Sequence, residues 1–190
     1  GSTPFAYFAG RVLRGIDLRE HGSGNLGATN VYRTLGAVAA IVVLLLDAAK
    51  GAVPVLFFPT VTGAGGEGWP VAFGIAAIVG HVRPYAGMFK GGGKGVATAS
   101  GVFAALAPVP FLAAFMTFVA VVGVTRYVSL GSMLGAVALA TTVVWREGPR
   151  AMLTAVSLAI AAFVVWTHRA NIGRLRRGEE SRLGRPGGAP

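Results

Sequence analysis

The sequence has no cysteine and few charged residues. The absence of Cys excludes disulfides, thiolate nucleophiles and Cys-based metal sites. The three His are far apart and show no metal-ligand spacing, so we expect neither a metal nor another cofactor. Only 13% of the residues are charged, and the 7 acids stand against 17 Lys and Arg. A soluble domain needs a more polar surface, so a membrane protein is the first class to test.

The basic residues give the chain a net charge of +10. This charge would suggest nucleic-acid binding if the basic residues covered one soluble face. They cluster instead in short polar segments between long apolar runs, and 54% of all residues are hydrophobic. Basic loops between apolar runs are typical of the cytoplasmic side of a membrane protein. We therefore expect membrane lipids, and no nucleic acid, as partners.

The apolar runs predict membrane-spanning helices. None of them alternates with a period of two, and Ala, Leu, Val and Gly dominate, so helices that are apolar all round are expected. A first stretch ends near Leu13, short of the roughly 20 residues of a full span, which predicts a first helix without its N-terminal half. Six further runs lie at 36–58, 69–86, 95–107, 109–124, 128–145 and 150–167.

The basic segments also predict the topology. If the loops around Arg19 and Lys90 and the tail after His168 all face the cytoplasm, an even number of crossings separates Lys94 from His168. A turn at Pro108-Val109-Pro110 gives four crossings, whereas one long span would give three. We predict one all-α integral membrane domain over residues 1–190, with seven short transmembrane helices, the N-terminus outside and the C-terminus inside.

The first of three polar, Gly-rich segments runs from His21 to Arg33. Small residues let the backbone approach a ligand, and Arg is a bidentate donor suited to phosphate. A helix N-cap and turn would favour the same residue types, so this alternative stays open. The candidate ligand-binding residues are Ser23, Asn25, Thr29, Asn30 and Arg33.

The second segment is a glycine run between two lysines, just before an expected helix. Successive backbone N–H groups and a helix N-terminus form a cradle for anions. The spacing fits neither a P-loop nor the dinucleotide fingerprint. The alternative is a flexible hairpin with snorkelling lysines. The candidate phosphate-binding residues are Lys90, Gly91, Gly92, Gly93, Lys94, Gly95 and Thr98.

The third segment follows the last apolar run. His168 and Asn171 are three residues apart, so on a continuing helix they share a face and could address one ligand. The alternative is a bystander His beside an Arg-rich tail that contacts anionic lipid. Within the second run, Asp47 and Lys50 are expected to pair with each other inside the protein in a structural role. His81, at a helix end, is expected to orient the glycine run.

These motifs resemble those of the bacterial acyl-phosphate-dependent glycerol-3-phosphate acyltransferases. The resemblance implies seven spans in a bacterial inner membrane, cytoplasmic motifs and synthesis of 1-acylglycerol 3-phosphate. It adds Ser129 and Ser132 as binding residues and Glu180 as a structural acid. The glycine run has one Gly more than the family pattern, and Thr167 replaces an expected basic residue. The matching stretches are Gly22 to Gly36, Asp47-x-x-Lys50-Gly51, Lys90 to Thr98, Tyr127 to Ser132, and His168-x-x-Asn171 to Leu175.

The resemblance also implies a mechanism and partners. Acyl phosphate is a mixed anhydride with a good leaving group, so the enzyme mainly has to position it against glycerol 3-phosphate. The residues assigned to catalysis are His168, Asn171, Ser23 and Arg33. We expect a monomer that receives its donor from the soluble enzyme that makes acyl phosphate. A small transporter of phosphorylated anions is the main alternative function, and a membrane phosphatase is another.

Overall fold

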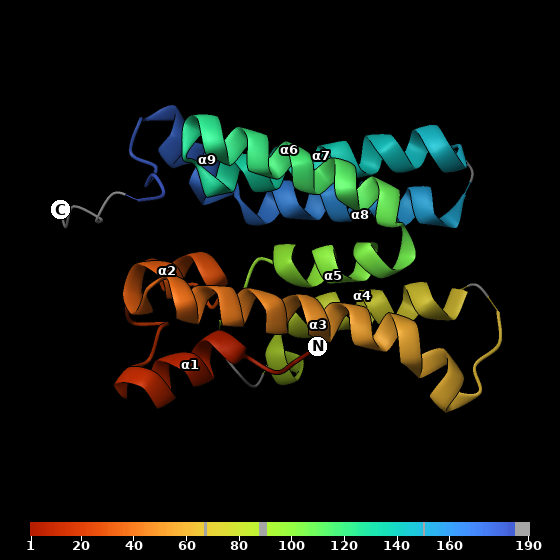
Figure 1. The fold of residues 1–190 in the computed structure, drawn as a ribbon, viewed down its shortest axis with the longest axis horizontal. Helices are drawn as coiled ribbons and strands as arrows, with labels where there is room; N and C mark the ends of the chain where they lie inside the picture. The colour runs from red at the N-terminus through yellow and green to blue at the C-terminus, as the bar shows by residue number, and fades with distance from the viewer. Residues whose placement is uncertain (67, 88–90, 150, 185–190) are drawn as a thin grey trace. The chain divides into compact units, whose positions relative to one another are not determined.

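The computed structural model describes residues 1–66, 68–87, 91–149 and 151–184. Over these residues the chain is helical and has no strand (Figure 1). It forms two compact units, Gly1–Leu106 and Ala107–Pro190. That residues 1–190 form a single domain stays a prediction.

Unit 1 is organised around one long helix. The helix α3 packs against α2, α4 and α5, and α1 and the loop after it lie against α2 and the start of α3. Their shared core consists of Ala6, Leu18, Leu26, Val31, Ala40 and Val43. The elements are α1 (Phe5–Arg14), α2 (Ala28–Leu35), α3 (Ala37–Thr62), α4 (Gly68–Val82), the short 3-10 helix η1 (Pro84–Gly87) and α5 (Val96–Leu106).

Two glycines bring α3 and α5 into close contact. A Cβ atom on Gly51 of α3 would overlap the carbonyl oxygen of Thr98, and one on Gly101 of α5 would overlap the carbonyl oxygen of Ala48. Small residues allow this approach of two backbones, as is common between membrane helices. The contact fixes the first turn of α5, which follows the glycine run, against the middle of α3.

Unit 2 contains α6 (Pro108–Thr125), α7 (Val128–Glu147), α8 (Met152–Thr167) and α9 (Arg169–Arg176). The helix α7 packs against α6 and α8, again through small residues, since Gly135 lies against the backbone of α6 at Ala114. The break between two helices near Pro108 is confirmed, but the expected position of the turn is wrong. Pro108 and Pro110 belong to the first turn of α6, where a missing backbone N–H costs no helical hydrogen bond.

Helices lie at all seven predicted positions. Among the described residues, α3, α6 and α7 are long and apolar enough to cross a membrane, and α8 with α9 adds a fourth candidate that is bent by 55°. The shorter apolar helices α4 and α5 have 15 and 11 residues. Seven crossings with the N-terminus outside therefore stay a prediction.

Two short helices lie within the first and third polar segments. The helix α2 carries Thr29, Asn30 and Arg33, so the second half of the first polar segment is helical. The helix α9 follows α8 after a bend of 55° at His168, so the condition under which His168 and Asn171 were expected to share a face, a continuing helix, is not met. Neither helix contains a long apolar run, which explains why hydrophobicity alone did not indicate them.

Candidate phosphate-binding and acyl-transfer site

The first polar segment folds around the side chain of Asn30, which is only 1% exposed. Its Oδ1 accepts a hydrogen bond from the backbone N–H of Ser23 at 2.9 Å. Its Nδ2 donates to the carbonyl oxygens of Leu18 and His21 at 3.1 and 3.0 Å. Both amide hydrogens are thus used inside the protein. These bonds let Asn30 close the loop that presents Ser23, and its expected role in substrate binding stays a prediction.

Three other candidates of this segment keep accessible side chains. Ser23 and Arg33 are exposed, and Thr29 is half-buried near the start of α2. Ser23 follows Gly22 and precedes Gly24, which have φ angles of 61° and 68°. Glycine adopts these left-handed angles without strain, so the turn around Ser23 depends on both of them. Ser23, Thr29 and Arg33 therefore stay candidates for contact with a substrate.

Asn25 contacts the glycine run of the second segment. Its Nδ2 donates a hydrogen bond to the carbonyl oxygen of Gly92 at 3.4 Å. The first and second polar segments therefore meet within unit 1. This contact uses one amide hydrogen of Asn25, and its expected role in substrate binding stays a prediction.

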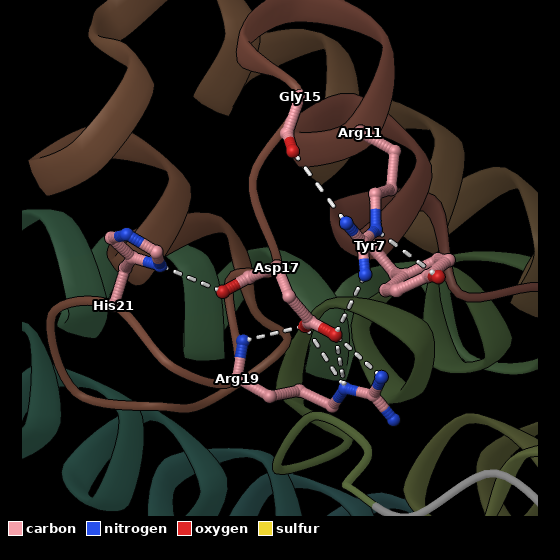
Figure 2. Close-up of polar contacts among 6 residues, drawn as sticks. All are labelled: Tyr7, Arg11, Gly15, Asp17, Arg19 and His21. Carbon is pink, nitrogen blue, oxygen red and sulfur yellow. Dashed lines mark hydrogen bonds and ion pairs between the residues drawn. The ribbon is translucent and has the colours of Figure 1, made fainter.

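A buried acid near these segments was missed in the sequence analysis. The carboxylate of Asp17 accepts hydrogen bonds from the backbone N–H and Nε of Arg19 at 3.0 and 2.9 Å (Figure 2). Nη2 of Arg11 lies 3.4 Å from it, and the ring of Tyr7 lies under both guanidinium groups. The bonds from Arg19 outweigh the cost of burial and lower the pKa of Asp17 to about 2. The Asp-x-Arg spacing directly after a helix is the signal that could have indicated this pair.

Arg19 also lies against the glycine run. Its Cδ and Cγ would be 3.4 and 3.6 Å from a Cβ atom on Gly91. Because Asp17 holds the guanidinium, the aliphatic part of Arg19 has a fixed place beside this loop.

The glycines of the second segment serve two different purposes. Gly91 and Gly95 have φ angles of 86° and 84°, which other residues rarely adopt. Gly92 and Gly93 are needed for space, since a Cβ on Gly92 would overlap the carbonyl oxygen of Val82 and one on Gly93 would overlap Nε2 of His81. Over residues 91–95 the run therefore packs closely against the end of α4, which argues against a flexible hairpin.

The lysines and Thr98 flank this loop. Lys94 is half-buried just before α5, whereas Lys90 lies outside the described residues. Thr98, in the first turn of α5, is 0% exposed, and its Oγ1 has no hydrogen-bond partner among the described residues. A buried hydroxyl usually has a partner, so Thr98 is a candidate to complete the anion cradle.

Asp47 and Lys50 pair inside unit 1, as the sequence predicts. Nζ of Lys50 lies 2.6 Å from Oδ1 of Asp47 and donates a hydrogen bond to the carbonyl oxygen of Thr3 at 2.8 Å. Nδ1 of His81 lies 3.6 Å from the same carboxylate oxygen. The pair thus supports the end of α4 on which the glycine run rests.

In unit 2, the carboxylate of Glu180 accepts hydrogen bonds from three neighbouring polar side chains. Oε1 accepts from Nδ2 of Asn171 at 2.6 Å and from Oγ of Ser129 at 2.8 Å, and Oε2 accepts from Nε of Arg174 at 2.7 Å. Burial alone would raise the pKa of Glu180, but the bonds from Asn171, Ser129 and Arg174 outweigh it and lower the pKa below its usual range. This geometry suits the structural role that the resemblance implied for Glu180.

These contacts limit what the two serines can do. The hydroxyl hydrogen of Ser129 is directed at Glu180, and Oγ of Ser132 donates to the carbonyl oxygen of Val128 at 2.9 Å. Both can still accept a hydrogen bond, but neither is placed as an activated nucleophile. Their expected role in binding stays a prediction.

His168 lies at the bend between α8 and α9 and is buried. Its Nδ1 is 2.7 Å from the carbonyl oxygen of Val164. A carbonyl oxygen only accepts, so Nδ1 carries the hydrogen and the neutral ring has its lone pair on Nε2. Asn171, in the first turn of α9, is fixed by Glu180. The structure thus gives both residues a defined orientation within unit 2.

Comparisons with known proteins agree with the family resemblance of the sequence motifs. The profile of the family described as glycerol-3-phosphate acyltransferase matches residues 1–178. The glycerol-3-phosphate acyltransferase of Geobacter sulfurreducens is 47% identical, over 96% of this chain and 92% of that protein. The corresponding protein of Parasynechococcus marenigrum is 46% identical, over 97% of this chain and 85% of that protein.

Two solved structures are also similar. Both are crystal structures of PlsY, an integral membrane glycerol 3-phosphate acyltransferase, and each is 38% identical to this chain, of which it covers 95%. The glycerol 3-phosphate form has a TM-score of 0.82 over 90% of that protein, and the lysophosphatidic acid form has 0.78 over 92%.

Proposed function

Because this chain belongs to the glycerol-3-phosphate acyltransferase family of integral membrane enzymes, we propose that it transfers an acyl chain from acyl phosphate to the 1-hydroxyl group of sn-glycerol 3-phosphate. The products are 1-acylglycerol 3-phosphate and inorganic phosphate. The similar PlsY structures, in a glycerol 3-phosphate form and a lysophosphatidic acid form, support this substrate and this product.

One observation carries the choice of acyl phosphate as donor. Nδ1 of His168 contacts a neutral backbone carbonyl, and the hydroxyls of Ser129 and Ser132 are directed at other acceptors. A nucleophile–base–acid triad needs a hydroxyl bonded to the base and a carboxylate behind it. A mixed anhydride brings its own leaving group, so it does not require such a triad.

The reaction balances without a covalent enzyme intermediate. The 1-hydroxyl oxygen of glycerol 3-phosphate attacks the acyl carbonyl carbon, a C–O ester bond forms, and the bond from that carbon to the phosphate oxygen breaks. The hydroxyl proton passes to a phosphate oxygen of a substrate. Nε2 of His168 is the other acceptor to be tested. The enzyme contributes chiefly by holding both reactants in place and by screening their negative charge.

The residues fall into two groups. One group is proposed to contact substrate, and the other holds the first group in place. The glycine run with Lys94 takes a phosphate group, with Lys90 as the family pattern implies, and Thr98 completes the cradle with its buried hydroxyl. Ser23, Thr29 and Arg33 orient substrate phosphate and hydroxyl groups, and His168 with Asn171 binds glycerol phosphate. Asp47, Lys50 and Glu180 are positioning residues, and Asn25 and Asn30 hold the loops in place as well. Ser129 and Ser132 stay candidates for substrate binding.

We further propose that the polar segments face the cytoplasm of a bacterial cell from the inner membrane. The basic residues that surround them support this orientation, because cytoplasmic loops retain Lys and Arg. Glycerol 3-phosphate and the soluble enzyme that supplies acyl phosphate would then reach the same side of the membrane.

The test is an assay of the purified protein in detergent or nanodiscs with palmitoyl phosphate and glycerol 3-phosphate. We expect 1-acylglycerol 3-phosphate and phosphate in equal amounts, and no product when an acyl thioester replaces acyl phosphate. Product from the thioester would contradict the proposed donor. Phosphate release without glycerol 3-phosphate would indicate a phosphatase, and flux of phosphorylated anions into liposomes without product would indicate a transporter.

A further inference from the structure

His81, which is buried at the C-terminal end of α4, lies between a charged pair and the glycine run. On one side its Nδ1 is 3.6 Å from Oδ1 of Asp47, which is ion-paired with Lys50. On the other side its Nε2 occupies the place where a side chain of Gly93 would begin. The side chain of His81 is only 5% exposed, so the ring has little freedom to turn away.

The charged pair favours one orientation of the ring. A carboxylate only accepts hydrogen bonds, so the ring nitrogen that faces Asp47 is favoured to carry a hydrogen. Nε2 is then directed at Gly93, where it places a polar atom next to a loop that is expected to hold an anion. Lys50 balances the charge of Asp47, so the carboxylate adds little net negative charge near that anion.

From these contacts we propose that His81 is a positioning residue of the anion cradle. Its imidazole, oriented by Asp47, sets how closely the Gly93 peptide approaches α4 and thereby fixes the loop for phosphate binding. The inference rests on the proposed function, because the anion is taken to be a substrate phosphate. It goes beyond that function by assigning a role in phosphate affinity to His81, a buried residue of α4.

Gly92 provides a matched comparison for Gly93. A Cβ on Gly93 would overlap the ring of His81, a side chain that can be shortened by substitution. A Cβ on Gly92 would overlap the backbone carbonyl oxygens of Val82 and His81, which no side-chain substitution removes. If the ring of His81 is what excludes a side chain at Gly93, a smaller residue at position 81 should make room for one there. The same substitution should leave the obstruction at Gly92 in place.

The experiment compares two sets of variants. The first set is Gly93→Ala, His81→Ala and their combination. The second set is Gly92→Ala alone and Gly92→Ala combined with His81→Ala. We expect His81→Ala to raise KM for one phosphorylated substrate by about 10-fold, with kcat within about 3-fold, because binding and not chemistry is affected. Gly93→Ala should lose at least about 10-fold in kcat/KM, and the double variant should regain about 3-fold or more of that loss. His81→Ala should not rescue Gly92→Ala.

Folding and binding are followed separately from turnover. Thermal unfolding in detergent shows whether each variant is folded, and His81→Asn replaces His81→Ala if the latter is not. Stabilisation of each protein by added glycerol 3-phosphate or inorganic phosphate measures binding without catalysis. If wild-type protein shows this stabilisation but makes no product, the proposed function fails while the role of His81 is still tested. Unchanged phosphate affinity in folded His81 variants, or equal rescue of both glycine variants, would overturn the inference.

Discussion

The side-chain amide of Asn25 donates to the carbonyl oxygen of Gly92 at 3.4 Å and so joins two segments that are 67 residues apart in the chain. This bond links the turn around Ser23 to the glycine run. It gives the first polar segment a contact with the glycine run that the residue types alone did not indicate. Removal of the bond should therefore loosen both the turn around Ser23 and the glycine run.

We predict that Asn25→Asp weakens this connection. The carboxylate has the shape of the amide, but it only accepts hydrogen bonds and would repel the Gly92 carbonyl. We expect the free energy of unfolding to fall by about 1 kcal/mol or more without substrate, and KM for a phosphorylated substrate to rise. Thermal unfolding and steady-state kinetics measure the two effects. A raised KM with unchanged stability would show that Asn25 acts on the substrate and not on the loop.

Most of the fold could be predicted because long apolar runs are a strong signal. The runs at 36–58 and 128–145 became α3 and α7 with few changes at their ends. The helices α2 and α9 could not be predicted in this way, since they have eight residues each and mixed polarity. They depend on tertiary contacts, such as the burial of Val31 in the core of unit 1.

The candidate site was predictable as a set of residues but not as a set of roles. Ser, Asn and Gly are suited to ligand binding and to loop closure alike, and only the folded chain shows which partner each has found. Asn30 is enclosed by backbone groups, and Asn171 is held by Glu180, whereas Ser23 is exposed. Gly92 and Gly93 suggested an open cradle, but their lack of side chains also makes room for α4.

The Asp17–Arg19 pair should contribute stability that depends on pH. The pKa of Asp17 in the folded protein is about 2, below the ordinary aspartate value of 3.8, so folding favours the ionised form. Its contribution is present above pH 3.8 and is lost as the pH falls toward 2. We expect Asp17→Asn to lower the unfolding temperature at neutral pH and the difference from wild type to shrink below about pH 4. Glu20→Gln is the control, because Glu20 is exposed. A difference that stays constant down to pH 2 would contradict this assignment.

Glu180 and Glu179 offer a matched pair of neighbouring acids. Glu180→Gln should cost about 2 kcal/mol of stability, because the new amide cannot accept from Ser129, Asn171 and Arg174 together. Glu179 pairs with Arg177 at the exposed surface, so Glu179→Gln should change stability by about 0.5 kcal/mol or less. Chemical unfolding in mixed micelles can compare the two. Equal effects would show that the buried contacts of Glu180 are not decisive.

The absence of native Cys makes the predicted topology accessible to labelling. Val109 is exposed in the first turn of α6 and is predicted to face the periplasm. We expect Val109→Cys to react with an impermeant thiol reagent added to intact cells, whereas Ser181→Cys in the C-terminal tail should react only after the membrane is opened. Reaction of Val109→Cys only after the membrane is opened would overturn the prediction of four crossings between Lys94 and His168.

The last prediction separates two roles of His168, a general base and a binder of substrate. His168→Ala removes both roles and cannot decide between them. His168→Asn and His168→Gln keep a neutral hydrogen-bond donor but cannot titrate near neutral pH. One of these amides should be able to replace the Nδ1–H that faces Val164.

If His168 were the base, both amide variants should lose turnover by about 100-fold or more, and the limb of the pH–rate profile near the imidazole pKa should vanish. If a substrate phosphate takes the proton, one amide variant should keep much of its turnover and mainly show a raised KM. The limb between about pH 6 and 7 should then persist, because a phosphate monoester also ionises near pH 6. We expect the second outcome, since Nδ1 of His168 contacts a neutral carbonyl, which stabilises a protonated ring less than a carboxylate in that place would. Collapse of turnover with unchanged substrate binding in both amide variants would establish His168 as the base instead.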